Sequence, residues 1–141
     1  MTTVKVFDEL LGHRMMDVYL SDKKREWDAD EMIFVRDDGA KFMFYHEQDC
    51  CESVGIVDIV GEITDLIGTP LTMAEQVSEG SEEVPEEHKE DLYYFEDSHT
   101  WTFYKFATVQ GYVTVRWLGT SNGYYSEEVD FEQVNEVSEY E

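Results

Sequence analysis

An almost unbroken run of strand-forming residues in the last third of the chain constrains the fold more than any other feature. Residues 99–109 are nearly all β-branched, aromatic or threonine, and such side chains favour extended backbone. Gln110-Gly111 predicts a turn, after which apolar and polar side chains alternate over residues 112–118, as in a strand with one buried face. A second turn at Asn122-Gly123 and a strand over 124–129 complete a predicted three-stranded meander.

A hairpin is also predicted in the first half of the chain. Residues 31–36 and 41–46 are rich in aromatic and β-branched side chains, and Asp38-Gly39 lies between them. Asp-Gly between two such runs is a strong hairpin signal, because glycine accepts the positive φ of a tight turn. Residues 16–20 alternate in polarity and residues 54–60 are rich in valine and isoleucine, so both predict further strands.

Two short helical segments are expected. Thr69-Pro70 is a good helix start, since threonine caps the first turn and proline suits the first helical position; the predicted helix covers residues 70–77. Residues 7–12 predict one helical turn that Gly12 ends. The predicted fold class is therefore α+β, mainly antiparallel β-sheet with hairpins and a meander and one or two short helices.

The predicted core draws on most of these segments. Trp101 and Trp117 are expected to form a cross-strand aromatic pair. The apolar residues expected to be mostly buried are Ile33, Val35, Phe42, Phe44, Ile56, Ile59, Leu66, Phe103, Val113, Val115 and Trp117.

Charge limits the partners that this chain can bind. It has 33 acidic and 10 basic residues among 141, for a net charge of −23. Direct binding to nucleic acid is not expected, because that affinity comes largely from lysine and arginine on phosphates; a basic protein is the natural complement. The length predicts a single domain, 1–141, with an acidic mobile loop over about 78–98 and an acidic tail over about 131–141.

The sequence predicts a cytoplasmic protein, in the host cytoplasm if the gene belongs to a phage. Its first residues do not have the pattern of a secretory signal, and no apolar run approaches the roughly 20 residues that span a bilayer. Cys50 and Cys51 are adjacent, and a disulfide between neighbours is geometrically unfavourable. Both thiols are therefore expected to be reduced.

The stretch from Tyr45 to Ser53 contains the residues best suited to chemistry. His46 and Cys50, with His99 elsewhere in the chain, are candidate metal ligands. A structural zinc site needs four ligands, usually in paired spacings that are absent here. A reactive thiolate is disfavoured by the negative local charge. The expectation is a buried small cysteine, no bound metal, no cofactor and no catalytic residue.

Four segments resemble a family of small acidic proteins common in bacteriophages and prophages. They are Tyr45–Val54, Asp65–Pro70, Thr100–Lys105 and Ser121–Ser126, in the same order as in the family. The resemblance covers roughly residues 10–131. It implies a phage context, but the family is one of unknown function, so it implies no activity and no catalytic residues.

The main hypothesis is an acidic binding protein that is not an enzyme. It would mimic nucleic acid and inhibit a host nucleic-acid-binding or defence protein, as anti-CRISPR or anti-restriction proteins do, with its carboxylates in place of phosphates. The candidate partner-binding residues are Asp58, Glu62, Asp65, Tyr124 and Tyr125.

Two alternatives stay open. One is a thiol- or metal-dependent protein centred on His46, Cys50 and Cys51, together with Glu52 and His99. The other is a virion or assembly component, which should show a large apolar surface patch.

Overall fold

The computed structural model describes residues 3–21, 31–46, 51–79, 84, 86 and 98–134. In these ranges the chain forms nine strands and one 3-10 turn, η1. In order they are β1 Thr3–Val6, β2 Met15–Ser21, β3 Glu31–Arg36, β4 Lys41–Tyr45, β5 Glu52–Val60, η1 Ile63–Leu66, β6 Met73–Glu79, β7 Ser98–Thr108, β8 Gly111–Ser121 and β9 Asp130–Val134.

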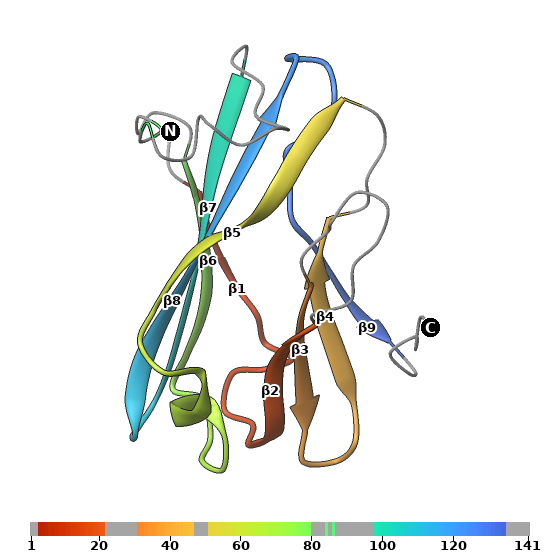
Figure 1. Ribbon diagram of the computed structural model, residues 1–141. Helices are drawn as coiled ribbons and strands as arrows, with labels where there is room; N and C mark the ends of the chain where they lie inside the picture. Colours follow the sequence, from red (N-terminus) through yellow and green to blue (C-terminus); the bar gives the residue numbers. More distant parts are fainter. Residues whose placement is uncertain are drawn as a thin grey trace.

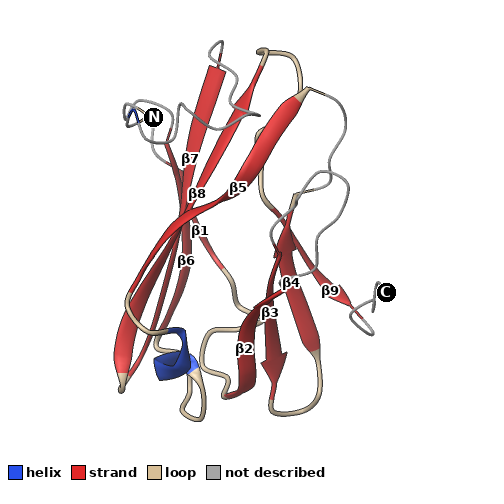
Figure 2. Ribbon diagram, in the orientation of Figure 1, coloured by secondary structure: helices blue, strands red, loops and turns tan. Residues whose placement is uncertain are grey.

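The strands form two antiparallel sheets that face each other (Figure 1). The five-stranded sheet has the order β1-β6-β7-β8-β5, and the four-stranded sheet has the order β2-β3-β4-β9. Helical structure in the described part is limited to η1 and Glu86 (Figure 2). The antiparallel β prediction is confirmed, but the fold is mainly β rather than α+β.

The predicted helix over residues 70–77 is wrong. Those residues enter β6, which lies between β1 and β7 and pairs with both. Ala74 is fully buried against the core, while Val77 lies opposite Phe103 on the other face. Pro70 forms a β-bridge with Arg14 in place of a first helical turn. Pairing with two neighbouring strands outweighed a local signal for helix initiation.

Two of the three predicted hairpins are confirmed. β3 and β4 join at Asp38-Gly39, where Gly39 has φ +91°, and β7 and β8 join at Gln110. The third is wrong, because residues 124–129 form no strand and β9 pairs with β4 in the other sheet. β5 occupies the side of β8 that the predicted strand would have needed, so the chain crosses between sheets after Ser121 (Figure 1).

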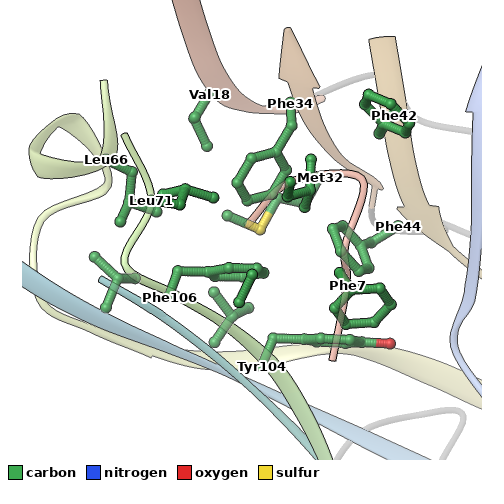
Figure 3. Packing of buried hydrophobic residues seen from close by; sticks show 14 of the residues in the cluster. Phe7, Val18, Met32, Phe34, Phe42, Phe44, Leu66, Leu71, Tyr104 and Phe106 are labelled. Carbon is green, nitrogen blue, oxygen red and sulfur yellow. The ribbon is translucent and has the colours of Figure 1, made fainter. Parts of the chain in front are cut away.

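The space between the sheets is filled by aromatic side chains from both (Figure 3). Phe44 of β4 contacts Phe7 at 5.2 Å and Tyr104 of β7 at 4.6 Å between ring centroids. Phe34 of β3 contacts Phe106 of β7 at 4.8 Å. One shared core of this kind makes the two sheets a single folding unit.

Most of the predicted core residues are buried, with four exceptions. Ile33, Phe42, Phe44, Leu66, Val113, Val115 and Trp117 are buried. Val35, Ile56, Ile59 and Phe103 are only partly buried.

The expected pair of Trp101 and Trp117 is wrong, because the two rings lie on opposite faces of the five-stranded sheet. Trp117 is opposite Thr102 and points into the core, whereas Trp101 is opposite Leu118. Trp101 belongs to a second cluster on the outer face with Leu118 and Val84. Adjacent residues of a strand alternate faces, and the register of β7 on β8 decides which side each tryptophan takes.

The predicted acidic loop and tail fall largely outside the described residues. Of the predicted loop, 80–83, 85 and 87–97 are not described, whereas Val84 is buried against the outer-face cluster. The predicted tail began too early, because residues 131–134 belong to β9; residues 135–141 lie outside the described part.

The β3–β4 hairpin contains an ion pair whose contribution to stability should be measurable at acidic pH. Arg36 donates from Nε to Asp38 Oδ1 at 3.0 Å and from Nη2 to Oδ2 at 2.7 Å. These bonds, with one from the amide of Ala40, lower the pKa of Asp38 from 3.8 to about 2. Between those two pH values the unfolded chain binds more protons than the folded chain. The Asp38 carboxylate therefore contributes its full share to the stability of the fold above pH 3.8, and this share is lost as pH falls through about 2.

We therefore expect the stability difference between the wild type and Asp38→Asn to shrink as pH falls from about 4 to about 2. Urea unfolding at a series of pH values measures this, with Asp37→Asn as the neighbouring control. A stability difference between the wild type and Asp38→Asn that stays constant over this pH range would contradict the ion pair between Arg36 and Asp38.

Candidate functional site

The five candidate partner-binding residues do not form one surface. Glu62 and Asp65 lie at η1, near the Gly111 end of β8, whereas Tyr124 and Tyr125 follow its Ser121 end. β8 has 11 residues, so its ends are about 35 Å apart. Figure 1 shows η1 at the bottom of the molecule and the connection from β8 to β9 at the top. The acidic residues at η1 and the two tyrosines therefore belong to separate surfaces.

Of the three acidic candidates, Asp58, which lies opposite Arg116 midway along β8, is already paired within the fold. Asp58 pairs with Arg116 at 3.0 Å, which neutralises its charge locally. The partly buried side chain of Asp65 lies against Gly111, where an added Cβ would clash with its carboxylate. Glu62 is exposed. These three residues are therefore weak as a shared decoy for phosphates.

At the other end, the segment of residues 122–129, here called the tyrosine loop, is ordered by its own side chains. The amide of Gly123 donates to Ser121 Oγ at 2.9 Å, and the amide of Tyr124 donates to Asn122 Oδ1 at 3.0 Å. The amide of Glu128 donates to Ser126 Oγ at 3.2 Å. Short polar side chains that bond backbone two residues on are the usual means of fixing such turns.

Glu127 fastens the tyrosine loop to the five-stranded sheet. Its carboxylate, nearly buried, accepts hydrogen bonds from Thr100 Oγ1 at 2.7 Å and from Ser121 Oγ at 2.5 Å. Its backbone lies directly on Gly119 of β8, where an added Cβ would be 2.5 Å from the Glu127 carbonyl oxygen. Glycine at position 119 thus permits the close approach, and two hydroxyl groups satisfy the buried charge.

His46 ties the same loop to the start of β5. Its Nδ1 lies 2.7 Å from the carbonyl oxygen of Glu128, and its Nε2 lies 2.8 Å from Oε2 of Glu52, the first residue of β5. Both side chains are almost completely buried. Because a carbonyl only accepts, Nδ1 must donate. A single proton then lies between Nε2 and Oε2, and the pair is neutral as a whole.

This arrangement presents one tyrosine to solvent on a fixed loop. Tyr124 is 83% exposed, and its ring meets that of the half-buried Tyr125 edge to face at 5.1 Å. Exposed Glu128 follows in the same loop. A rigid aromatic side chain on an ordered loop suits a binding contact, since little conformational entropy is lost on docking.

Carboxylates follow the loop into β9. Burial raises the pKa of the Tyr104 hydroxyl, and the charges of Asp130 and Glu128 raise it further. Glu132 is exposed on β9, an edge strand of the four-stranded sheet.

The metal and thiol candidates are not brought together in the described residues. Both ring nitrogens of His46 are engaged, and His99 lies on β7 opposite Thr120. In the described ranges no three His, Cys, Asp or Glu side chains are grouped so as to hold a metal ion.

The expectation of reduced thiols is wrong for Cys51, which is disulfide-bonded. Cys50, the only other cysteine of the chain, lies outside the described residues. The expectation had rested on the preference of disulfides for cysteines whose Cα atoms lie further apart than those of adjacent residues.

Sequence reasoning found Tyr124 but missed how the loop beneath it is held. His46 and Glu52 were named only for a thiol or metal site and Ser121 only for a turn. Glu127 was not singled out, because carboxylates are so frequent here that no pair stands out. The usable signal was the Ser-Asn-Gly sequence at 121–123, which predicted a turn with positive φ, and Gly123 has φ +92°.

Comparison with known proteins gives a family and no activity. A family model described as a domain of unknown function, DUF7448, matches residues 8–131. No curated protein and no solved structure matches the chain significantly. Within the part of the chain that the structure describes, no helix has the length and apolarity to cross a membrane.

Proposed function

Because the chain belongs to the DUF7448 family, whose function is unknown, we propose from its geometry and charge that it is an acidic binding protein that docks on a basic protein through the tyrosine loop. The observation that carries the proposal is the exposure of Tyr124 on a loop fixed by buried hydrogen bonds. Tyr124 buries little of its surface, so it contributes little to stability, whereas the loop that presents it is held by several buried hydrogen bonds. Tyrosine is also among the residues that most often dominate binding energy in protein interfaces.

Charge supports a basic partner. The net charge of −23 would speed the approach of a positively charged protein and would repel nucleic acid. Glu128 is exposed within the tyrosine loop, and Glu132 is exposed on β9, which follows it. We place docking here rather than at Asp58, whose carboxylate is paired with Arg116, or at Asp65, which is partly buried beside Gly111.

The specific form of the proposal is a nucleic-acid mimic that inhibits a nucleic-acid-binding or defence protein of a host cell. The surplus of carboxylates supports it, since a groove lined with lysine and arginine accepts carboxylates in place of phosphates. A cytoplasmic site of action is part of this proposal, although the disulfide at Cys51 is of a kind that reducing compartments disfavour.

A binding role is favoured over a catalytic one by the state of His46. A general base needs a ring nitrogen that can reach a substrate proton. Both nitrogens of His46 are within 2.8 Å of protein oxygens, and the ring is buried. We therefore propose that His46 and Glu52 position the loop.

The proposal is tested by capture from a bacterial lysate at low salt, followed by competition. We expect the wild type to retain a basic protein that duplex DNA displaces, and Tyr124→Ala to retain at least about tenfold less of it, as expected for a tyrosine that dominates an interface. Added salt should weaken capture, because screening shortens the range of attraction to about 8 Å at 0.15 M.

Tyr112→Ala is the matched control, since Tyr112 is also exposed but lies at the opposite end of β8. Equal losses from the two tyrosine variants would remove the tyrosine loop as the docking site. A captured protein that DNA does not displace would refute the mimicry while leaving a binding role.

A further inference from the structure

The turn at Asn122-Gly123, which opens the tyrosine loop, contains a chemically reactive pair of residues. Asparagine is labile in proteins, and most so before glycine, whose lack of a side chain lets its nitrogen approach the carboxamide carbon of the asparagine. Asn122 and Gly123 are both exposed, so water can reach them. Asn135, the other asparagine of the chain, is followed by Glu136. The sequence therefore contains a single asparagine–glycine pair.

The turn holds the carboxamide of Asn122 close to the backbone that would attack it. The amide of Tyr124 donates to Oδ1 of Asn122 at 3.0 Å, and this bond folds the side chain back along residue 123. Attack of the Gly123 nitrogen on Cγ of Asn122 would place negative charge on Oδ1. The N–H of Tyr124 is thus already in the position of an oxyanion donor, which stabilises the charge that develops during the reaction.

One hydroxyl group links the amide of Gly123 to a buried carboxylate. The amide donates to Ser121 Oγ at 2.9 Å, and the Ser121 hydroxyl donates to Oε2 of Glu127 at 2.5 Å. Ser121 is completely buried and Glu127 nearly so. A proton that leaves the Gly123 nitrogen can therefore pass to Ser121 while Ser121 passes its own proton to Glu127, as in general base catalysis by positioned groups.

The hairpin at Asp38-Gly39 has the same turn geometry with a different partner for its glycine amide. Gly39 has φ +91°, against +92° for the glycine of the tyrosine loop, and Asp38 Oδ1 likewise accepts a bond of 3.0 Å from the amide two residues on. The amide of Gly39, however, donates to the carbonyl oxygen of Arg36 at 2.9 Å. A carbonyl has no proton to pass on, so this turn is a matched reference for the effect of Ser121 and Glu127.

We propose that the start of the tyrosine loop is a self-modifying site, at which Asn122 is deamidated with Ser121 and Glu127 as the proton relay. The Gly123 nitrogen forms a bond to Cγ of Asn122, and its proton reaches Glu127 through Ser121. The bond from Cγ to the side-chain nitrogen then breaks, that nitrogen takes a proton back, and ammonia leaves a five-membered succinimide. Water opens the succinimide at either carbonyl, so asparagine and water become aspartate or isoaspartate and ammonia. The reaction needs no oxidant or reductant, and the proposal does not depend on a partner at Tyr124.

Incubation of the purified full chain at neutral pH, followed by peptide mass spectrometry and an assay of released ammonia, tests the proposal. We expect the folded wild type to convert Asn122 at least about tenfold faster than the same chain in urea, since positioned acid–base groups typically contribute more than that. Ser121→Ala and Glu127→Gln should each slow the conversion at least about tenfold for the same reason. The amide that Asp38→Asn introduces into the hairpin should also react at least about tenfold more slowly than Asn122.

The pH profile separates a relay from a merely structural role of Glu127. Without a protein base, hydroxide must remove the amide proton, so the rate should rise about tenfold per pH unit. We expect that slope in Glu127→Gln and a much shallower one in the wild type between about pH 6 and about pH 8. His46, Glu128 and Asp130 also titrate in or beside the loop, but they are present in both proteins. A difference in slope therefore belongs to Glu127.

An unchanged or faster reaction in folded Ser121→Ala or Glu127→Gln would overturn the proposal, because it would show that their hydrogen bonds only restrain the loop. A folded wild type that converts Asn122 no faster than the chain in urea would overturn it as well. Circular dichroism shows whether each variant folds. If neither does, the Asp38→Asn protein decides, since its tyrosine loop is intact, and equal rates at the two turns would refute the relay.

Discussion

Replacing His46 with alanine is expected to lower the free energy of unfolding by about 3–5 kcal/mol, because removing one partner of a buried charged pair leaves the other without compensation. Glu52 is fully buried at its side chain and would lose the bond to Nε2. The carbonyl of Glu128 would lose its bond to Nδ1 at the same time. Urea unfolding followed by tryptophan fluorescence measures the change.

His13→Ala is the control, since His13 is exposed, and it should change stability by less than about 0.5 kcal/mol. Adding Glu52→Gln to His46→Ala should recover part of the loss, because the amide removes the buried negative charge. A loss below about 1 kcal/mol from His46→Ala would show that water or another group replaces the imidazole and that the pair is not the anchor described here.

The second large effect is expected at Phe44. Phe44→Ala should cost about 3–5 kcal/mol, the range for removing a large aromatic side chain from a closed core. Its ring is fully buried and lies within 6 Å of Phe7, Phe34, Tyr104 and Phe131. Both sheets contribute these contacts, so the cavity left by alanine would lie at the centre of their packing (Figure 3).

Phe103→Ala is the matched comparison, because it is the same chemical change on a half-buried site. Phe103 lies on the outer face of β7, with Cζ of Arg116 5.8 Å from the centroid of its ring. Phe103→Ala should lower the free energy of unfolding by about 1–2 kcal/mol, in proportion to the smaller buried area of this side chain. The sequence offered no reason to separate these two residues. Equal losses from the two variants would mean that the outer face is as closed as the core.

The helix over 70–77 shows where local signals were overridden. Thr69-Pro70 is a valid helix start, but Ala74 and Val77 are also spaced so that one faces the core and the other the outer surface of a strand. β1 and β7 both supply backbone partners there. A short segment that lies between two strands can hydrogen-bond more of its backbone N–H and C=O groups as a strand than as two helical turns.

The positions of the candidate site residues were beyond sequence reasoning for a related reason. His46, Glu52 and Glu128 are separated by as many as 82 residues, yet they meet where β4, β5 and the tyrosine loop converge. No spacing rule links them, since they belong to both sheets. Asp58 and Asp65 resembled any other exposed acid until the structure placed Arg116 and Gly111 beside them.

The sequence by itself determined six of the nine described strands, two hairpins, most core residues and the excess of negative charge. Each depends on neighbours within a few residues, because period-two alternation, Asp-Gly turns and composition are local properties. Only the tertiary structure decided which sheet each strand joins, which face each tryptophan takes and which carboxylates are buried. Those outcomes depend on the register between strands that are distant in sequence, because a shift of one residue in that register moves every side chain of the strand to the opposite face of the sheet.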